Sequence, residues 1–348
     1  MATDASGLPV RPVEHRLADA TRLPAPFVWL LATLLLLAAG AAWHNLTGAW
    51  QGFEADGQPV WQTSWRIEII FAVIIGYVFA CGGWVVRSVC RDLDALAPAL
   101  TLDAAELAAE RGRIGVFPPA TLLAAGAVGV AAGLAMHALV NAMLPPDHVA
   151  LRDGAWRVVR DITLWVLAVR LTWVVIASST AVSRLSGRAA RIDLLDLRPL
   201  GPLAHIGLRG ALVFALAASM IAAMAGDVRT LPLTLFSMAV VGAAGALALV
   251  LPVRGVHRAI RAAKNAELRS VRAEIAALRG PALAGGMPAP EEAAPLGGLL
   301  AYEARIAGVS EWPFDVGTFV RFAAFLALPL GSWIASGMVE WVIARALG

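Results

Sequence analysis

Four ionisable residues lie inside or at the ends of long apolar runs, where a charge is costly. They are Glu68, His137, Arg170 and Glu340. Ionisable groups in a membrane span usually mark a substrate or proton pathway or form an internal pair. Counted from the ends of their runs, all four are expected in the outer half of the membrane. Arg170 is predicted to pair with a carboxylate there, Glu340 being preferred over Glu68.

The spacing of neighbouring residues extends this polar set. Four residues of one run recur at every fourth position, namely Gly129, Gly133, His137 and Asn141. Residues four apart share a helix face, and small and polar residues on such a face favour close helix contacts. The sequence therefore predicts an intramembrane polar cluster, either a static packing seam with one ion pair or a polar cavity open to the outside. Its members are Glu68, His137, Asn141, Arg170, Ser336 and Glu340.

No motif for enzyme chemistry accompanies these residues. The chain contains no His-Glu-x-x-His and no Walker A loop, and its glycines lack dinucleotide-binding spacing. Its 6 histidines are scattered and suggest no set of metal ligands. The sequence therefore predicts no catalytic residue, no metal and no cofactor, and we do not expect an enzyme.

Long apolar helices must position the polar residues. The chain has 348 residues, 59% hydrophobic and 15% charged, whereas soluble domains have about 45–50% apolar and about 25% charged residues. Seven runs are long enough to cross a hydrocarbon core of about 30 Å as helices. They are Pro26–Trp43, Ile67–Val86, Pro119–Met143, Ile162–Val182, Gly210–Gly226, Leu231–Leu251 and Phe319–Ile343. We expect an all-α polytopic membrane helical bundle of about seven transmembrane helices.

Two of these runs leave an alternative open. The first resembles the apolar region of a signal peptide, although its leader is long and carries three acidic residues, which favours an uncleaved anchor. The last contains Pro329 and Gly331. Proline removes a helical hydrogen bond, so this run is expected to be a kinked span or a re-entrant hairpin.

The distribution of basic residues predicts the orientation. Most of the 28 basic residues fall in segments on the same side as the N-terminus. The positive-inside rule places that side in the cytoplasm. Because topology explains the basic excess, nucleic acid is not an expected partner. The bias to Arg, with Lys264 as the only lysine, is typical of a GC-rich bacterial genome, which predicts a bacterial cytoplasmic (inner) membrane.

The longest polar stretch predicts a cytosolic helical hairpin. Apolar residues between Val256 and Leu278 recur at helical spacing, and a linker rich in Pro, Gly and Ala precedes a second short helix. The expected organisation is a cytosolic N-terminal segment (1–25), a six-helix transmembrane region (26–251), the hairpin (252–318) and a C-terminal span (319–348).

The first helix of this hairpin has a basic face with two interpretations. Its members are Arg258, Arg261, Arg269 and Arg272. Basic residues close to a membrane bind anionic lipid headgroups. The same face could instead bind a cytosolic protein partner, and a homo-oligomer is also compatible with the sequence.

Three segments resemble parts of an uncharacterised bacterial multi-pass membrane protein family. They are Asp193–Leu200, Pro252–Lys264 and Glu311–Asp315. The resemblance implies membrane class and location, and no established activity comes with it.

Two functional classes are consistent with these patterns. The intramembrane polar residues favour translocation of a small solute or an ion through the bundle. The basic hairpin favours a non-transporting membrane scaffold or sensor that acts through its cytosolic part.

Overall fold

The computed structural model describes residues 10–48, 60–143, 154–222, 231–284 and 290–312, together with single positions between 317 and 338. Within these ranges the secondary structure is helical apart from two isolated β-bridges. The predicted all-α bundle is therefore confirmed. Among the described residues, six helices are long and apolar enough, by length and composition, to cross a membrane, so the chain is a membrane-embedded protein.

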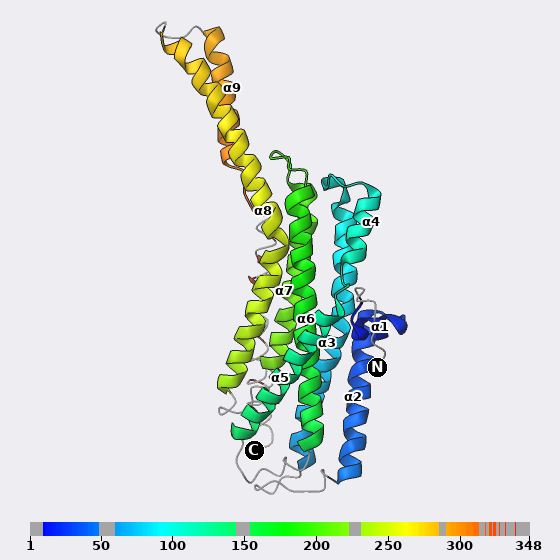
Figure 1. Ribbon diagram of the computed structural model, residues 1–348. Helices are drawn as coiled ribbons and strands as arrows, with labels where there is room; N and C mark the ends of the chain where they lie inside the picture. Colours follow the sequence, from blue (N-terminus) through cyan, green and yellow to red (C-terminus); the bar gives the residue numbers. More distant parts are fainter. Residues whose placement is uncertain are drawn as a thin grey trace.

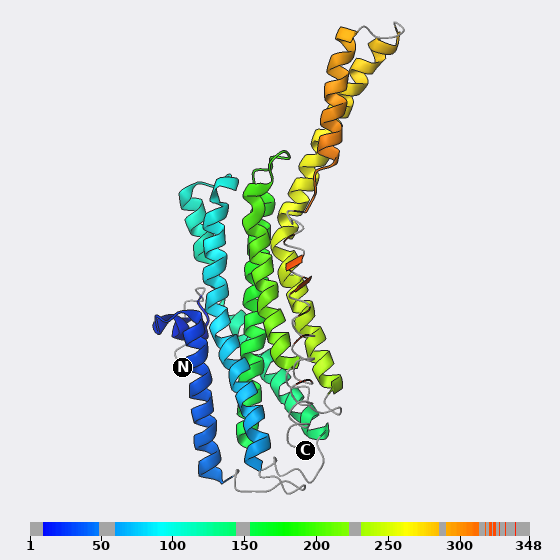
Figure 2. The same cartoon turned by 180° about the vertical axis from the view of Figure 1, so that it is seen from behind.

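The six candidate spans lie side by side and alternate in direction (Figures 1 and 2). We call the end of the bundle at which α2 begins the inner end and the opposite end the outer end. The spans belong to α2 (Ala25–Thr47), α3 (Val60–Leu96), α5 (Pro119–Met143), α6 (Gly154–Ala189), α7 (Gly201–Ala222) and α8 (Leu231–Ala284). Three shorter helices lie at the inner end, namely α1 (Val13–Ala20), α4 (Ala104–Arg113) and α9 (Pro290–Ala307).

The lengths of the helices indicate where the membrane lies. Helix α2 has 23 residues, which is about 34 Å and close to the thickness of a hydrocarbon core. Helices α3 and α6 have 37 and 36 residues, or about 55 Å. Figure 1 shows their extra length at the inner end, beyond α1 and the start of α2. The inner ends of α3 and α6 therefore project past the membrane.

The hydrophobic core lies mainly between α3, α6, α7 and α8 and continues into this projecting part. Leu93, Leu96 and Leu203 are fully buried. A β-bridge between Leu100 and Ala190 joins the segments that follow α3 and α6. Two 3₁₀ turns, η2 (Ala97–Ala99) and η4 (Arg198–Leu200), complete these connections. By contrast, α2 and α5 expose large apolar side chains, as a lipid-facing helix must.

Helix α8 passes from the bundle into the predicted hairpin without a break. It has 54 residues and includes Pro252, at the expected boundary between the spans and the hairpin. It ends at Ala284, and α9 begins at Pro290. Helix α9 runs back antiparallel along α8 (Figure 1), and its Ile306 is fully buried. The hairpin of α8 and α9 is therefore present, with a longer second helix than predicted.

The predicted seventh span, Phe319–Ile343, falls almost entirely outside the described residues. Ser336 and Glu340 also lie outside the described residues, so their membership of the polar cluster stays a prediction.

Candidate functional site

Charged and polar side chains of α3, α5 and α6 form one network near the outer end of the bundle. We call it the outer network. At its centre the Arg160 guanidinium donates to Glu68 and, over 3.2 Å from Nη2 to Oδ1, to Asp161. The same guanidinium lies 3.8 Å from the centroid of the Phe71 ring. The network consists of Glu68, His137, Asn141, Trp156, Arg157, Arg160 and Asp161.

The hydrogen bonds of this network have a fixed direction. Arg157 is only a donor, so its Nη2 donates to Oδ1 of Asn141 over 3.1 Å. The Asn141 amide nitrogen must then donate to Nε2 of His137, 2.9 Å away. His137 therefore bears its proton on Nδ1, which donates to Oδ2 of Asp161 over 2.9 Å. On the other side, Trp156 Nε1 donates to Glu68 over 3.1 Å.

The glycine stripe of α5 positions this chain against α6. A Cβ added at Gly129 would lie 2.5 Å from Cα of Val166, and one at Gly133 would lie 2.8 Å from Cα of Ile162. Only glycine permits so close an approach of the two backbones. The stripe continues through His137 and Asn141, which meet the α6 side chains directly.

The outer network is balanced in charge and complete in its hydrogen bonds. Glu68, Arg160 and Asp161 are each more than nine-tenths buried. The Arg160 guanidinium pairs with both carboxylates, and Arg157 donates to the Asn141 amide. His137 and Asp161 resemble a catalytic dyad, but Nε2, which would have to accept a proton from a nucleophile, already accepts from Asn141. This geometry indicates a structural role in which the network holds α3, α5 and α6 together.

The sequence placed Glu68, His137 and Asn141 in a common cluster, and the structure brings these three together. It missed Arg157, Arg160 and Asp161 because the apolar run of α6 begins only at Ile162, whereas the helix begins at Gly154. One signal was available: these residues have the three- and four-residue spacing of a single helix face.

The predicted position of Arg170 is wrong. Its Nε lies 3.1 Å from Oε1 of Glu14 in α1, at the inner end of the bundle. Arg170 is about 24 Å along α6 from Gly154. This distance is most of the membrane thickness, so Arg170 lies close to the inner surface, level with α1. Glu68, the second predicted partner, pairs with Arg160 instead. The physical reason for the error is the outward extension of α6, which moves every residue of this helix inward relative to the membrane.

Helix α1 presents a polar face to the bundle and an apolar face outward. Glu14 and His15 are buried, whereas Val13 and Leu17 are 57% and 56% exposed. The His15 ring lies on Gly82 of α3, where an added Cβ would be 2.2 Å from Nε2. This inverted pattern suits a helix that lies on the membrane surface with its apolar side toward lipid.

The buried position of His15 predicts a pH-dependent stability. Burial lowers its pKa from 6.5 to about 4, with Arg170, Arg87 and Arg11 also lowering it and Asp19 opposing them. Between these two pKa values the unfolded chain binds a proton that the folded chain does not, so stability falls as pH decreases from 6.5 to about 4. The free energy of unfolding should fall by on the order of 3 kcal/mol in total over this pH range.

We expect His15→Gln to remove this part of the pH dependence. The measurement is thermal unfolding in detergent from pH 7.5 to 4, compared with His205→Gln, which alters an exposed histidine. Parallel curves for the wild type and His15→Gln would show that His15 titrates normally.

The hairpin is anchored to the end of the described chain by polar contacts. The His257 ring stacks on Trp312 with 4.2 Å between centroids, and its Nδ1 donates to the Glu311 carbonyl over 2.9 Å. Lys264 Nζ donates to the Val309 carbonyl over 2.8 Å. These contacts return the chain to α8 near residues 257–264, well short of the hairpin tip.

The four arginines of the predicted basic face are all exposed. Arg272 pairs with Glu303 of α9 at 2.6 Å, and Arg261 lies 3.9 Å from Glu311. Arg269 donates to the Asn265 carbonyl of its own helix. The face is therefore open to solvent along the projecting part of α8.

No group of three or more His, Cys, Asp or Glu side chains in the described ranges is arranged to hold a metal ion. Comparison with known protein families, with characterised proteins and with solved structures finds no match. The function must therefore be inferred from the outer network, the surface of α1 and the projecting hairpin.

Proposed function

We propose that this chain is a non-transporting membrane scaffold or sensor, whose bundle holds the hairpin of α8 and α9 out from the membrane to bind a cytosolic protein. One observation supports this above all: α8 is a single helix of 54 residues that joins a membrane span to the hairpin. A continuous helix transmits its position and tilt from the span to the hairpin, as a scaffold or a sensor requires.

The part of α8 where it leaves the bundle, residues 249–256, is held by close contacts with α6 and α7. A Cβ at Gly255 would lie 1.7 Å from the Ser183 carbonyl oxygen, and one at Gly207 would lie 2.5 Å from the Leu249 carbonyl oxygen. Val253 and Val256 are fully buried in the same region. Since packed backbones cannot slide continuously past one another, the direction of the hairpin is set by the bundle.

The part of the basic face nearest the hairpin tip, Arg269 and Arg272, is too far from the membrane to bind lipid. Gly255 contacts α6 about 20 Å beyond Arg170, the residue that lies level with α1. Arg272 is about 25 Å further along α8, and Figure 1 shows α8 and α9 projecting alone there. Charges more than about 10 Å apart are largely screened in physiological salt. Arg269 and Arg272 therefore favour a protein partner over a lipid headgroup.

The charge along α8 indicates the kind of partner. Exposed arginines follow this helix from Arg258 to Arg279, with Glu267 and Glu274 as its acidic residues, and Glu303 of α9 pairs with Arg272. Electrostatic complementarity then favours an acidic protein surface. The positive-inside rule supports the matching orientation, with the inner end in the cytoplasm of a bacterial cell and the spans in its inner membrane.

Translocation is less well supported by the described residues. In the outer network, the main intramembrane polar group among them, the charges of Glu68, Arg160 and Asp161 are paired, and the network closes the contact between α3, α5 and α6. A transport pathway needs polar groups that can exchange water or an ion for one another. The paired arrangement favours a rigid support.

A hairpin deletion tests the proposal. Lys264 contacts Val309, so removing residues 266–307 and joining Asn265 to Gly308 by a short glycine-serine linker should leave the base intact. We expect the deletion to fold with an unchanged bundle and to lose a stoichiometric protein complex that the full chain forms in its native membrane. Reversing two charges in the intact hairpin, Arg269→Glu with Arg272→Glu, should weaken the same complex.

Liposomes provide the opposing outcome. If the full chain carries protons or potassium into dye-loaded vesicles and the hairpin deletion retains that flux, the chain is a transporter and the scaffold proposal fails. Unfolding curves of both forms in the same detergent control for damage to the bundle.

A further inference from the structure

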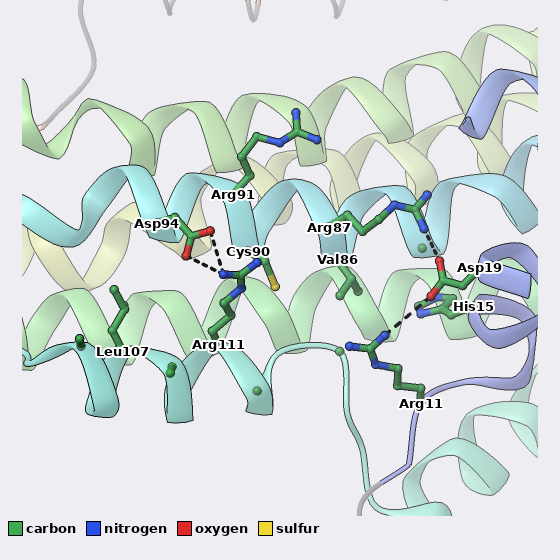
Figure 3. A pocket seen from close by; sticks show the side chains of 15 residues that line it. Arg11, His15, Asp19, Val86, Arg87, Cys90, Arg91, Asp94, Leu107 and Arg111 are labelled. Atoms are coloured by element: carbon green, nitrogen blue, oxygen red, sulfur yellow. Dashed lines mark hydrogen bonds and ion pairs between the residues drawn. The ribbon is translucent and has the colours of Figure 1, made fainter. Parts of the chain in front are cut away.

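A groove of about 690 Å³ lies between α1, α3 and α4 at the inner end of the bundle (Figure 3). This volume is within the range of small-molecule sites, about 300–1,000 Å³. Arginine side chains reach it from three segments of the chain: Arg11 precedes α1, Arg87 and Arg91 belong to α3, and Arg111 belongs to α4.

Positive charge in this groove is not fully neutralised. Asp19 is the single carboxylate shared by Arg11 and Arg87, as Figure 3 shows. No carboxylate of the described residues lies within ion-pair distance of Arg91. Above them Arg111 pairs with Asp94 at 3.1 Å. Arg11 and Arg87 therefore share one negative charge, Arg91 has no carboxylate of the described residues at ion-pair distance, and the neutral His15 ring adds no charge.

The groove opens at the depth of the lipid headgroups. His15 of α1 contacts Gly82 of α3, which places that glycine level with the membrane surface helix. Arg87 and Arg91 are then about 7 and 13 Å further from the membrane centre, and a headgroup layer is about 5–8 Å thick. Arg87 lies within this layer, and the long Arg91 side chain can extend back toward it.

The apolar surface beside the groove suits acyl chains. Val13 and Leu17 are exposed on α1, the helix that contributes His15 and Asp19 to the groove. Phe27 and Leu30 of α2 are 58% and 54% exposed on the adjoining helix. An amphiphile with its phosphate at the arginines would have its chains against this surface.

We propose that the groove between α1, α3 and α4 binds the phosphate of an anionic phospholipid in the leaflet at the inner end, with Arg87 and Arg91 as its main contacts. A guanidinium forms directed, charge-assisted hydrogen bonds with phosphate oxygens. An anionic lipid is favoured over a zwitterionic one because the groove has an excess positive charge. This site is separate from the hairpin and does not depend on the proposed partner.

The test is thermal unfolding of the full chain in neutral detergent, titrated with phosphatidylglycerol, phosphatidylcholine or glycerol 3-phosphate. We expect phosphatidylglycerol alone to raise the unfolding temperature strongly. Arg91→Gln, which breaks no ion pair, should weaken its apparent affinity about fivefold, and Arg87→Gln with Arg91→Gln should weaken it on the order of 25-fold. The matched control is Arg113→Gln, since Arg113 pairs with Glu110 outside the groove.

Three results would overturn the proposal. The first is no response to phosphatidylglycerol, and the second is an equal response to glycerol 3-phosphate, which would assign the groove to a free phosphate compound. The third is an equal loss of affinity for phosphatidylglycerol in Arg113→Gln, which would indicate a diffuse surface charge. A second measurement needs no variant. Phosphatidylglycerol with a photoreactive group near its phosphate should label the α3 segment of residues 83–94, and labelling elsewhere only would contradict the site.

Discussion

Replacing Arg160 with methionine should lower the free energy of unfolding by about 3–5 kcal/mol, since it leaves the buried carboxylates of Glu68 and Asp161 without their shared cation. The measurement is unfolding by sodium dodecyl sulfate in mixed micelles. The triple variant with Glu68→Gln and Asp161→Asn should recover much of the loss, because neutral side chains need no counterion.

The control for this prediction lies on the same helix. Arg188 is 61% exposed and pairs with Glu110, so Arg188→Met should change the stability by about 0–1 kcal/mol. A loss for Arg160→Met no greater than that for Arg188→Met would mean that the outer network does not hold the three helices together.

Gly255→Ala should be the most damaging change of a single methyl group. The added Cβ would lie 1.7 Å from the Ser183 carbonyl oxygen, and this backbone atom can move only if α6 and α8 separate. We expect a loss of about 3 kcal/mol or more, at or above the upper end of overpacking effects. The distance between spin labels on α6 and α8 at the inner end should also increase.

Gly242 provides the matched control, because it belongs to the same helix and an added Cβ there meets nothing within 4 Å. Gly242→Ala should be neutral or slightly stabilising. Equal stability of the two alanine variants would show that α8 is not held against α6 at Gly255 and that the bundle does not fix the direction of the hairpin.

Local periodicity predicted the parts of the structure that depend on one helix at a time. The stripe through Gly129, Gly133, His137 and Asn141 faces a neighbouring helix as expected, because residues four apart share a face whatever the tertiary fold. The hairpin of α8 and α9 was also predicted from spacing. In both cases the determining residues are close together in the sequence.

The pairing of Arg170 with Glu14 could not be predicted in this way. Hydropathy locates the apolar part of a helix and gives no information on how far the helix continues into polar sequence. The start of α6 at Gly154 therefore remained hidden, and so did the depth of Arg170. Glu14 appeared to belong to a solvated leader, and only the folding of α1 onto Gly82 brings it into contact with α6.

The predicted boundary between the spans and the hairpin, at residue 252, follows the end of an apolar run and says nothing about whether the helix continues. A proline at this boundary usually ends or bends a helix. In the structure α8 continues through it, since Ala248 before the proline and Val253 and Val256 after it are buried against the bundle and hold the helix despite one missing hydrogen bond.

Binding of a cytosolic protein to the hairpin can be detected by site-specific photo-cross-linking in the native host. A photoreactive amino acid would replace Leu278 or Leu300, which are 42% and 48% exposed on the hairpin. As controls, it would replace Leu123 or Val128, which are 60% and 58% exposed on α5. We expect a protein adduct of one discrete mass from the hairpin positions, lost when Arg269 and Arg272 are changed to Glu, and only lipid adducts from α5. If the hairpin positions give no protein adduct, or if α5 gives the same adducts, the hairpin is not the binding site of a protein partner.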